Sequence, residues 1–157
     1  MTEINGLRLA YRGFVTGLAG GYVWAAIGMT FGAVAVGDPL FVLRPFALAV
    51  SPLADTPATS FVLGFAAIQI GGAVVGMLFA YFFARFFTVR ATLTIAAPAV
   101  ALLAWSLIAA AFTRDIDGAA FAQHAAPVLA TLGYGVLLAA GIPVRGDVAR
   151  YSGSPST

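Results

Sequence analysis

The chain has 157 residues, of which 61% are hydrophobic and 9% are charged, and its formal net charge is +2. A soluble domain carries about 25% charged residues, so this composition excludes an ordinary soluble globule and places the chain among membrane proteins. The small net charge does not indicate a nucleic-acid partner. The absence of cysteine excludes disulfides, thiolate metal sites and cysteine nucleophiles.

Four uncharged apolar segments are long enough to be transmembrane helices, since about 20 residues cross a hydrocarbon core of about 30 Å. The predicted spans are residues 13–36, 61–84, 91–112 and 121–144. We therefore expect an all-α integral membrane protein with one four-span transmembrane domain over residues 13–144, folded as a four-helix bundle. A cleaved signal peptide is the alternative for the first span, but this run exceeds the usual apolar length of about 7–15 residues.

The charged residues lie between the spans and indicate an orientation. One side of the predicted membrane carries Arg8, Arg12, Arg85, Arg90, Arg145 and Arg150, and the other side carries Arg44 and Arg114. The positive-inside rule then predicts a cytoplasmic N-terminus (1–12), turn (85–90) and C-terminal tail (145–157), with external loops 37–60 and 113–120. Because every basic residue is arginine, as in GC-rich microbes, we expect the inner membrane of a prokaryote.

The first span contains the glycine-rich stretch GLAGGYVWAAIGMTFG, residues 17–32. A phosphate-binding loop is not indicated, because no strand precedes the stretch, no lysine follows it and GxGxxG is not matched. Glycines four residues apart in a helix instead allow two backbones to touch. The predicted packing glycines are Gly13, Gly17, Gly21, Gly28 and Gly32 in the first span and Gly64, Gly72 and Gly76 in the second. We expect these two spans to pack closely together or to offer this face to a partner.

The external segment 37–60 is apolar yet interrupted by prolines at positions 39, 45, 52 and 57. Prolines exclude one continuous helix, and residues 39–50 are too apolar for a solvated loop. We expect this segment to lie in the outer interface, with Phe41, Leu43, Phe46 and Leu48 toward lipid or protein. A re-entrant hairpin is the alternative, and it needs surrounding protein to satisfy its backbone.

Polar side chains occur at similar depth in all four predicted spans. The members of this predicted polar layer are Thr30, Gln69, Ser106 and Thr131, with Tyr134 close to them. Such a layer could line a small polar cavity or hold a quinone or pigment headgroup. The plainer interpretation, which we favour, is hydrogen bonding between helices, because a buried amide in lipid must find partners.

Aromatic residues gather at the inner end of the second span. The predicted partner or lipid contacts are Phe79, Phe82, Phe83, Phe86 and Phe87 there, together with Phe41 and Phe46 of the external segment. An aromatic belt at the interface is expected, and its surplus could be a docking face. Trp24 and Trp105 lie in mid-span, where packing is the expected role.

His124 is the only histidine, at the outer end of the fourth span. It could bind a haem, quinone or pigment, and Asp115 and Asp117 lie nearby in the sequence. One imidazole and two carboxylates are a weak metal signal, so we predict no metal site. A capping or headgroup-contacting histidine is the favoured interpretation.

No acidic residue lies inside any predicted span, whereas proton-coupled transporters generally rely on one. No serine, histidine and acid set is available either, so we do not expect an enzyme. We expect a non-catalytic accessory or structural subunit of a larger membrane complex, respiratory or photosynthetic, with other integral membrane subunits and lipids as partners. The first alternative is a small homo-oligomeric channel or carrier for a neutral solute. The second is haem, quinone or pigment binding through His124; the sequence requires no cofactor.

Overall fold

The computed structural model describes residues 6–83, 86–87, 89–112, 121 and 123–144. Within these ranges every regular element is helical. The elements are α1 (Gly6–Ala35), α2 (Arg44–Val50), α3 (Pro57–Leu78), the π-helical turn η1 (Phe79–Phe83), α4 (Arg90–Phe112) and α6 (Ala125–Gly141). The predicted loop 113–120 and tail 145–157 lie outside the described residues, as do Arg85 and the first five residues.

Three helices are long and apolar enough to cross a membrane: α1, α3 continued by η1, and α4. α1 starts at Gly6 and so extends beyond the first predicted span. α3 likewise starts before the second predicted span, because Thr56 caps it by accepting from the Thr59 N–H, and Pro57 opens its first turn. Predicted and observed bounds differ by one residue at the start of α4.

The helix in the fourth predicted span, 121–144, is shorter than that span at both ends. His124 is extended and caps the helix, so α6 begins at Ala125. Ile142 leaves the helix with φ −93° and ψ 125°, the conformation expected of a residue before proline. The 17 residues of α6 rise about 25 Å at about 1.5 Å per residue, less than the hydrocarbon thickness of about 30 Å.

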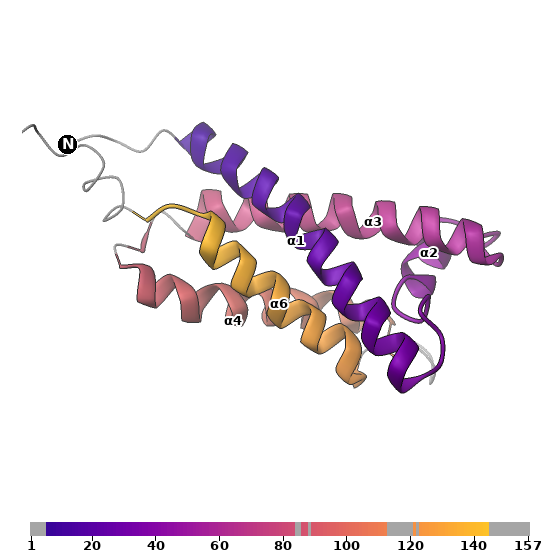
Figure 1. The fold of residues 1–157 in the computed structure, drawn as a ribbon. Helices are drawn as coiled ribbons and strands as arrows, with labels where there is room; N and C mark the ends of the chain where they lie inside the picture. Colours follow the sequence, from indigo (N-terminus) through magenta and orange to yellow (C-terminus); the bar gives the residue numbers. More distant parts are fainter. Residues whose placement is uncertain (1–5, 84–85, 88, 113–120, 122, 145–157) are drawn as a thin grey trace, which may run out of the picture.

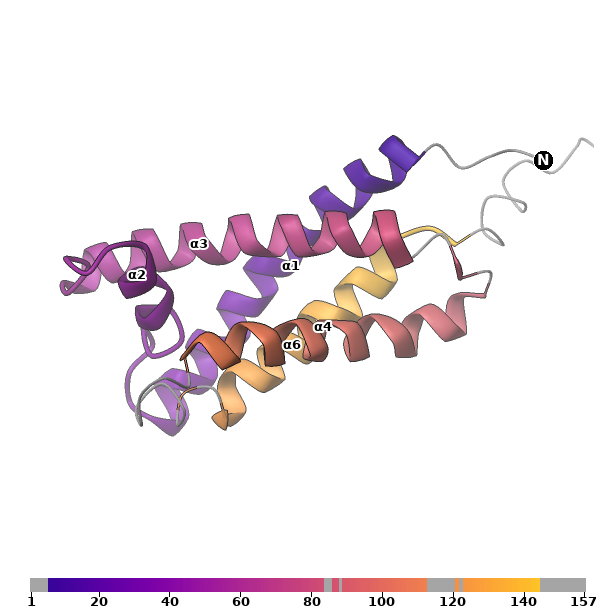
Figure 2. The ribbon, with the colours of Figure 1, turned by 180° about the vertical axis from the view of Figure 1, so that it is seen from behind.

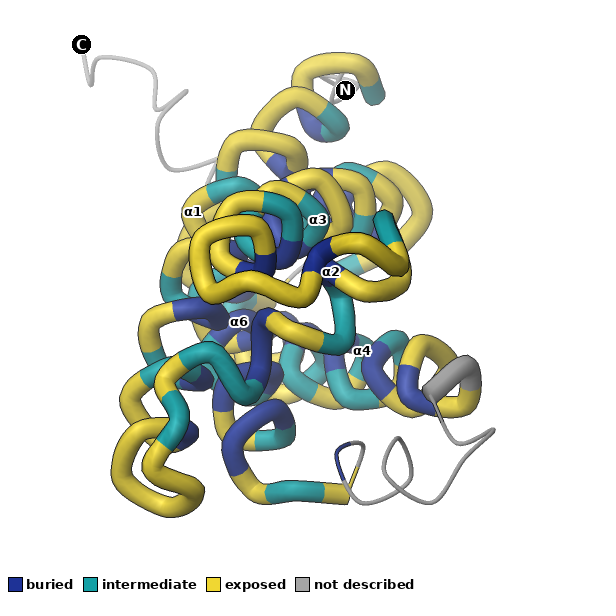
Figure 3. Tube along the Cα trace, turned by 90° about the vertical axis from the view of Figure 1, so that its right-hand side faces the viewer, coloured by how far each residue is buried: buried dark blue, intermediate teal, exposed yellow. Residues whose placement is uncertain are grey.

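The long helices pack in a chain of neighbours. α1 packs against both α3 and α6, α6 packs against α4, and α2 packs on α3. α1 crosses α3 obliquely (Figure 1), and α3 and α4 run along two sides with α1 and α6 behind them (Figure 2). Figure 3 shows the buried residues where helices face one another and the exposed residues on their outer sides. α3 and α4 are not a closely packed pair in the described part of the chain.

Glycines allow the backbones of α1 and α3 to touch. A Cβ on Gly76 would lie 2.7 Å from the Gly17 Cα, and a Cβ on Gly72 would lie 2.8 Å from the Gly17 carbonyl oxygen. Gly13 faces the Gly76 carbonyl, and Gly21 faces the Gln69 side chain. Because backbone atoms fill the space that a side chain would need, only glycine fits at this crossing.

The remaining predicted packing glycines contact the connection between α1 and α3. Gly28 packs on Val42, Gly32 on the Asp38 carbonyl and Phe41, and Gly64 on Leu43. These contacts hold the external segment against both helices. The glycine pattern of the sequence therefore serves two contacts, one with α3 and one with the connection.

The connection folds back onto the protein. It leaves α1 at Gly37, the only described residue with positive φ (76°), a conformation that glycine adopts without penalty. Asp38 then pairs with Arg44 at 3.1 Å. Leu43, expected to face lipid or protein, is fully buried together with Val42, so its neighbours are protein.

Candidate functional site: an apolar notch between α3 and α4

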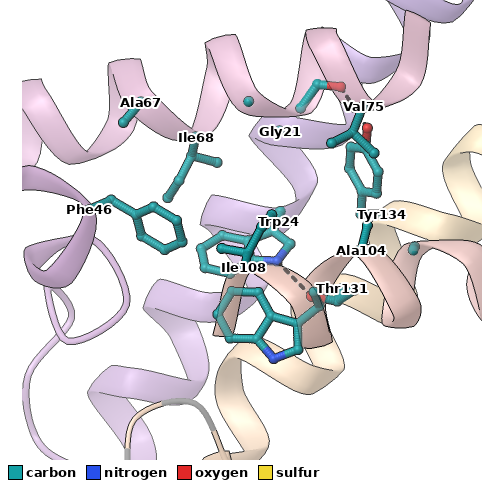
Figure 4. A pocket seen from close by; sticks show the side chains of 14 residues that line it. Gly21, Trp24, Phe46, Ala67, Ile68, Val75, Ala104, Ile108, Thr131 and Tyr134 are labelled. Atoms are coloured by element: carbon teal, nitrogen blue, oxygen red, sulfur yellow. Dashed lines mark hydrogen bonds between the residues drawn. The ribbon is translucent and has the colours of Figure 1, made fainter. Parts of the chain in front are cut away.

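A small concave site, which we call the notch, lies between α3 and α4 on the side where these helices do not pack together (Figure 4). Its cavity volume is about 90 Å³. Its walls are residues of α3 and α4, its floor is formed by α1 and α6, and Phe46 of α2 closes one end. The lining residues are Gly21, Trp24, Phe46, Ala67, Ile68, Gly71, Gly72, Val75, Ala101, Ala104, Trp105, Ile108, Thr131 and Tyr134.

The polar groups on the floor of the notch are bonded within the protein. The Trp24 indole N–H donates to the Thr131 hydroxyl at 3.0 Å (Figure 4), and that hydroxyl donates to the Pro127 carbonyl at 2.8 Å. The Tyr134 hydroxyl donates to the Gly72 carbonyl at 2.6 Å. No buried side-chain nitrogen or oxygen lacks a partner in the described ranges. The notch therefore offers an occupant mainly apolar surface.

Aromatic rings form the end of the notch nearest α2. Trp24 lies 5.9 Å from Trp105 and 5.6 Å from Phe46, measured between ring centroids. Trp105 in turn contacts Phe121 at 5.9 Å. Tilted and edge-to-face pairs at these distances are favourable beyond their buried area. The two mid-span tryptophans are thus packing residues, as the sequence suggested, and they also shape the notch.

The size of the notch limits what it can hold. Sites that enclose a small molecule have volumes of about 300–1,000 Å³, several times the roughly 90 Å³ measured here. A haem, a quinone ring or a pigment therefore does not fit inside it. One apolar side chain of a neighbouring helix, or a short stretch of acyl chain, is the occupant that the volume and the lining favour.

The structure does not bring the predicted polar layer together as one site. Thr131 and Tyr134 line the notch, whereas Thr30 and Ser106 are exposed. Each of these two hydroxyls donates to its own helix, Thr30 to the Ala26 carbonyl at 2.8 Å and Ser106 to the Leu102 carbonyl at 2.9 Å. Similar depth in the membrane does not place side chains on facing sides of their helices.

Gln69 connects α3 to the backbone of α1 and does not line the notch. In the amide orientation that satisfies both partners, its nitrogen donates to the Leu18 carbonyl at 2.9 Å and its oxygen accepts from the Tyr22 N–H at 3.1 Å. These two backbone groups are four residues apart, so the amide bridges one turn of α1. Gly21 leaves the space that the Gln69 side chain occupies.

Replacing Gln69 with leucine should therefore lower the free energy of unfolding by about 0.6–2 kcal/mol, the range for hydrogen bonds between membrane helices. Equilibrium unfolding in mixed micelles measures this change. Thr30→Val, which removes an exposed hydroxyl bonded to its own helix, is the control and should have a smaller effect. Unchanged stability together with lost solute flux in liposomes would instead place Gln69 in a transport pathway.

His124 caps α6. Its Nδ1 accepts a hydrogen bond from the Ala126 N–H at 3.1 Å, and its ring lies edge-on to Phe41 with centroids 4.8 Å apart. Because Nδ1 is engaged in the cap, only Nε2 remains for a ligand. Asp115 and Asp117 lie outside the described residues, and no group of three metal-binding side chains occurs in the part of the chain that the structure describes.

The phenylalanines predicted to contact a partner or lipid divide into two sets. Phe82, Phe83 and Phe86 are exposed. Phe79 is buried, contrary to that prediction, and Phe87 packs partly buried against the core. Since the π-helical turn η1 is wider than an α-helical turn, it directs Phe79 inward and the residues from Tyr81 to Phe83 outward.

Phe41 and Phe46 also lie against their own chain. Phe41 contacts Phe121 at 5.6 Å, and Phe46 contacts Trp24 in the notch. Both rings are only partly buried, so the expectation that they contact lipid or a partner stays a prediction. They pack on the core because the connection carrying them folds back onto the helices.

Sequence reasoning missed the notch and the role of Arg90. Ala67, Gly71 and Val75 recur every four residues on α3, a signal that could have indicated a second close-packing face. The Arg90 guanidinium donates to the carbonyls of Ala139 and Ala140 at 2.7 and 3.2 Å, a contact between residues about 50 positions apart. Cations near a helix C-terminus are stabilising.

Comparison with known proteins adds no family to these observations. No family model matches the chain, and no curated protein and no solved structure matches it.

Proposed function

We propose that this protein is a non-catalytic structural subunit of a larger membrane complex, and that the notch receives an apolar side chain of a neighbouring subunit's helix. One observation carries the proposal. The notch is open and apolar, and the polar groups on its floor are already bonded inside the chain. A site of this kind provides packing contacts for an apolar group and is not arranged for catalysis.

The packing of helices in lipid supports this proposal. Burial of apolar surface does not drive helices together there, so they associate through close van der Waals packing at small residues. Ala67 and Gly71 on α3 and Ala104 on α4 leave such space, and a Cβ on Gly71 would meet nothing within 4 Å. A helix lying along this side could therefore approach closely and insert one side chain.

We propose further that α6 is the fourth transmembrane span of a single four-helix domain covering residues 13–144. Its shortness is compatible with spanning, because a bilayer thins locally around a short helix at modest cost. The excess of arginines at one end favours cytoplasmic termini, in the inner membrane of a prokaryote. Respiratory and photosynthetic complexes are the assemblies in which we propose to search first.

The two alternative functions have less support. A channel or carrier would need a polar path, and the hydroxyls of Thr30 and Ser106 donate to their own helices and do not line the notch. A cofactor held by His124 would have to use Nε2 alone, since Nδ1 caps α6. Both remain proposals, and an absorbance spectrum of the purified protein tests the second.

A cross-linking experiment tests the proposed function directly. Because the chain has no cysteine, Ile108→Cys introduces a single thiol in the wall of the notch, and Leu107→Cys introduces one on the outer side of α4, where Leu107 is 71% exposed. Each thiol is labelled with a benzophenone and irradiated in native membranes. We expect an adduct from position 108 with a protein that also co-purifies with the tagged chain in stoichiometric amount.

Position 107 is the matched control. It is the neighbouring residue in the sequence, but its side chain lies on the outer side of α4 and not in the wall of the notch. Equal adducts from both positions would show contact with lipid-exposed surface in general. Cross-linking only to lipid, together with purification of the chain alone, would contradict the structural-subunit proposal.

A further inference from the structure

Two exposed arginines lie at the end of the molecule where α1 begins. Arg8 and Arg12 are exposed and one turn apart, so they lie on the same side of the helix. Leu9 and Gly13, the residues that follow them, face the packed interior, and Gly13 contacts the end of α3. The two guanidinium groups therefore project beside the packed face of α1, at the edge of the protein.

The described residues at this end carry positive charge only. The start of α1, the end of α3, the start of α4 and the end of α6 meet here (Figure 1). The described carboxylates, Asp38 and Asp55, both lie on the connection at the opposite end, and Asp38 is paired with Arg44. No described carboxylate forms an ion pair with Arg8 or Arg12. The charge of this edge is complementary to an anion.

The surroundings of the arginines are those of a membrane surface. Tyr11 is 67% exposed and Phe86 is 70% exposed, and the Tyr81 ring packs beside Gly6 at the start of α1. Tyrosine and other aromatic rings at this level mark the headgroup region. One turn deeper, Phe14 and Val15 are exposed, as expected of residues that face hydrocarbon. This order of side chains along α1 places the arginines at the level expected for the phosphate groups of a bilayer.

We propose that Arg8 and Arg12 bind the phosphate of an anionic phospholipid, with its acyl chains along the exposed apolar side of α1. A guanidinium group binds phosphate through two parallel hydrogen bonds, and weak hydration makes its transfer to the headgroup region less costly than that of an ammonium. Arg90 is the third arginine at this end among the described residues, and its side chain already donates to the last carbonyls of α6. Arg90 therefore fixes α6 beside α4, and the lipid contact is assigned to the two arginines of α1.

Native mass spectrometry of the full chain in neutral detergent tests the proposal. Phosphatidylglycerol and phosphatidylcholine with identical acyl chains are added separately, and the bound fraction of each is compared. We expect preferential binding of phosphatidylglycerol that weakens as salt rises. Each of Arg8→Gln and Arg12→Gln should lower its affinity roughly fivefold, and the double variant should lose the preference. If the double variant fails to fold, the two single variants still test the proposal.

Arg44→Gln is the matched control, because it removes the same charge at the opposite end of the molecule and should leave the preference unchanged. Equal binding of both lipids by the unmodified chain would overturn the proposal, as would an equal loss in Arg44→Gln. Displacement of phosphatidylglycerol by inorganic phosphate at the same concentration would also overturn it, since the site would then recognise free phosphate.

Discussion

Replacing Gly76 with alanine should destabilise the protein by about 2 kcal/mol. The new methyl group would lie 2.7 Å from the Gly17 Cα and against the Gly13 carbonyl. Alanine gains about 1 kcal/mol over glycine in helix propensity, whereas overpacking costs about 1–3 kcal/mol. Because the atoms in the way belong to backbone and cannot rotate aside, we expect the upper end of that cost, and the steric effect wins. Thermal unfolding followed by circular dichroism in detergent measures the change.

Gly71→Ala is the control for this experiment. It makes the same substitution on the same helix, but the new methyl group meets nothing within 4 Å. Its expected effect is neutral or stabilising by up to about 1 kcal/mol, from helix propensity alone. Equal effects of Gly76→Ala and Gly71→Ala would contradict the close crossing of α1 and α3.

Replacing Gly71 with leucine should weaken assembly with the partner about tenfold or more, while the isolated chain still folds. The leucine side chain would extend into the notch, whose volume is about 90 Å³, and would occupy the space proposed for a neighbouring helix. A cost of about 1.4 kcal/mol at the interface weakens association about tenfold. Quantitative co-purification of the tagged chain from native membranes measures the effect, and unfolding of the isolated variant is measured in parallel.

Ala66→Leu is the control for Gly71→Leu, because it introduces the same side chain on the same helix. Ala66 is exposed on the same helix and does not line the notch, so this variant should assemble like the unmodified chain. Retained assembly of Gly71→Leu would exclude the notch as the interface. Loss of assembly in both variants would show that the whole outer side of α3 contacts the partner.

The Gly76 and Gly71 substitutions separate folding from assembly. Gly76 lies where α1 and α3 touch, and Gly71 lies five residues earlier, at the open notch. The same residue type therefore has different roles on two sides of one helix. A loss of partner with unchanged unfolding cannot arise from a damaged crossing.

The sequence by itself determined the class of this protein and the approximate place of its helices. Apolar composition and the length of uncharged runs suffice for this, since the bilayer admits only segments that satisfy their own backbone. The four-residue spacing of Gly13, Gly17, Gly72 and Gly76 also indicated a face for close helix contact. Those signals are local, and each can be counted along the chain.

Only the tertiary structure decided which side of each helix meets which neighbour. Residue counting gave Thr30, Gln69 and Ser106 a common depth, yet Gln69 bridges to α1 while the two hydroxyls bond to their own helices. Two further features depend on tertiary structure in the same way, namely the π-helical turn that buries Phe79 and the fold-back that packs Phe46 against Trp24. Depth in a membrane follows from position in the sequence, but rotation about the helix axis and the choice of neighbour follow from packing between distant segments. The notch between α3 and α4 exists because of that packing.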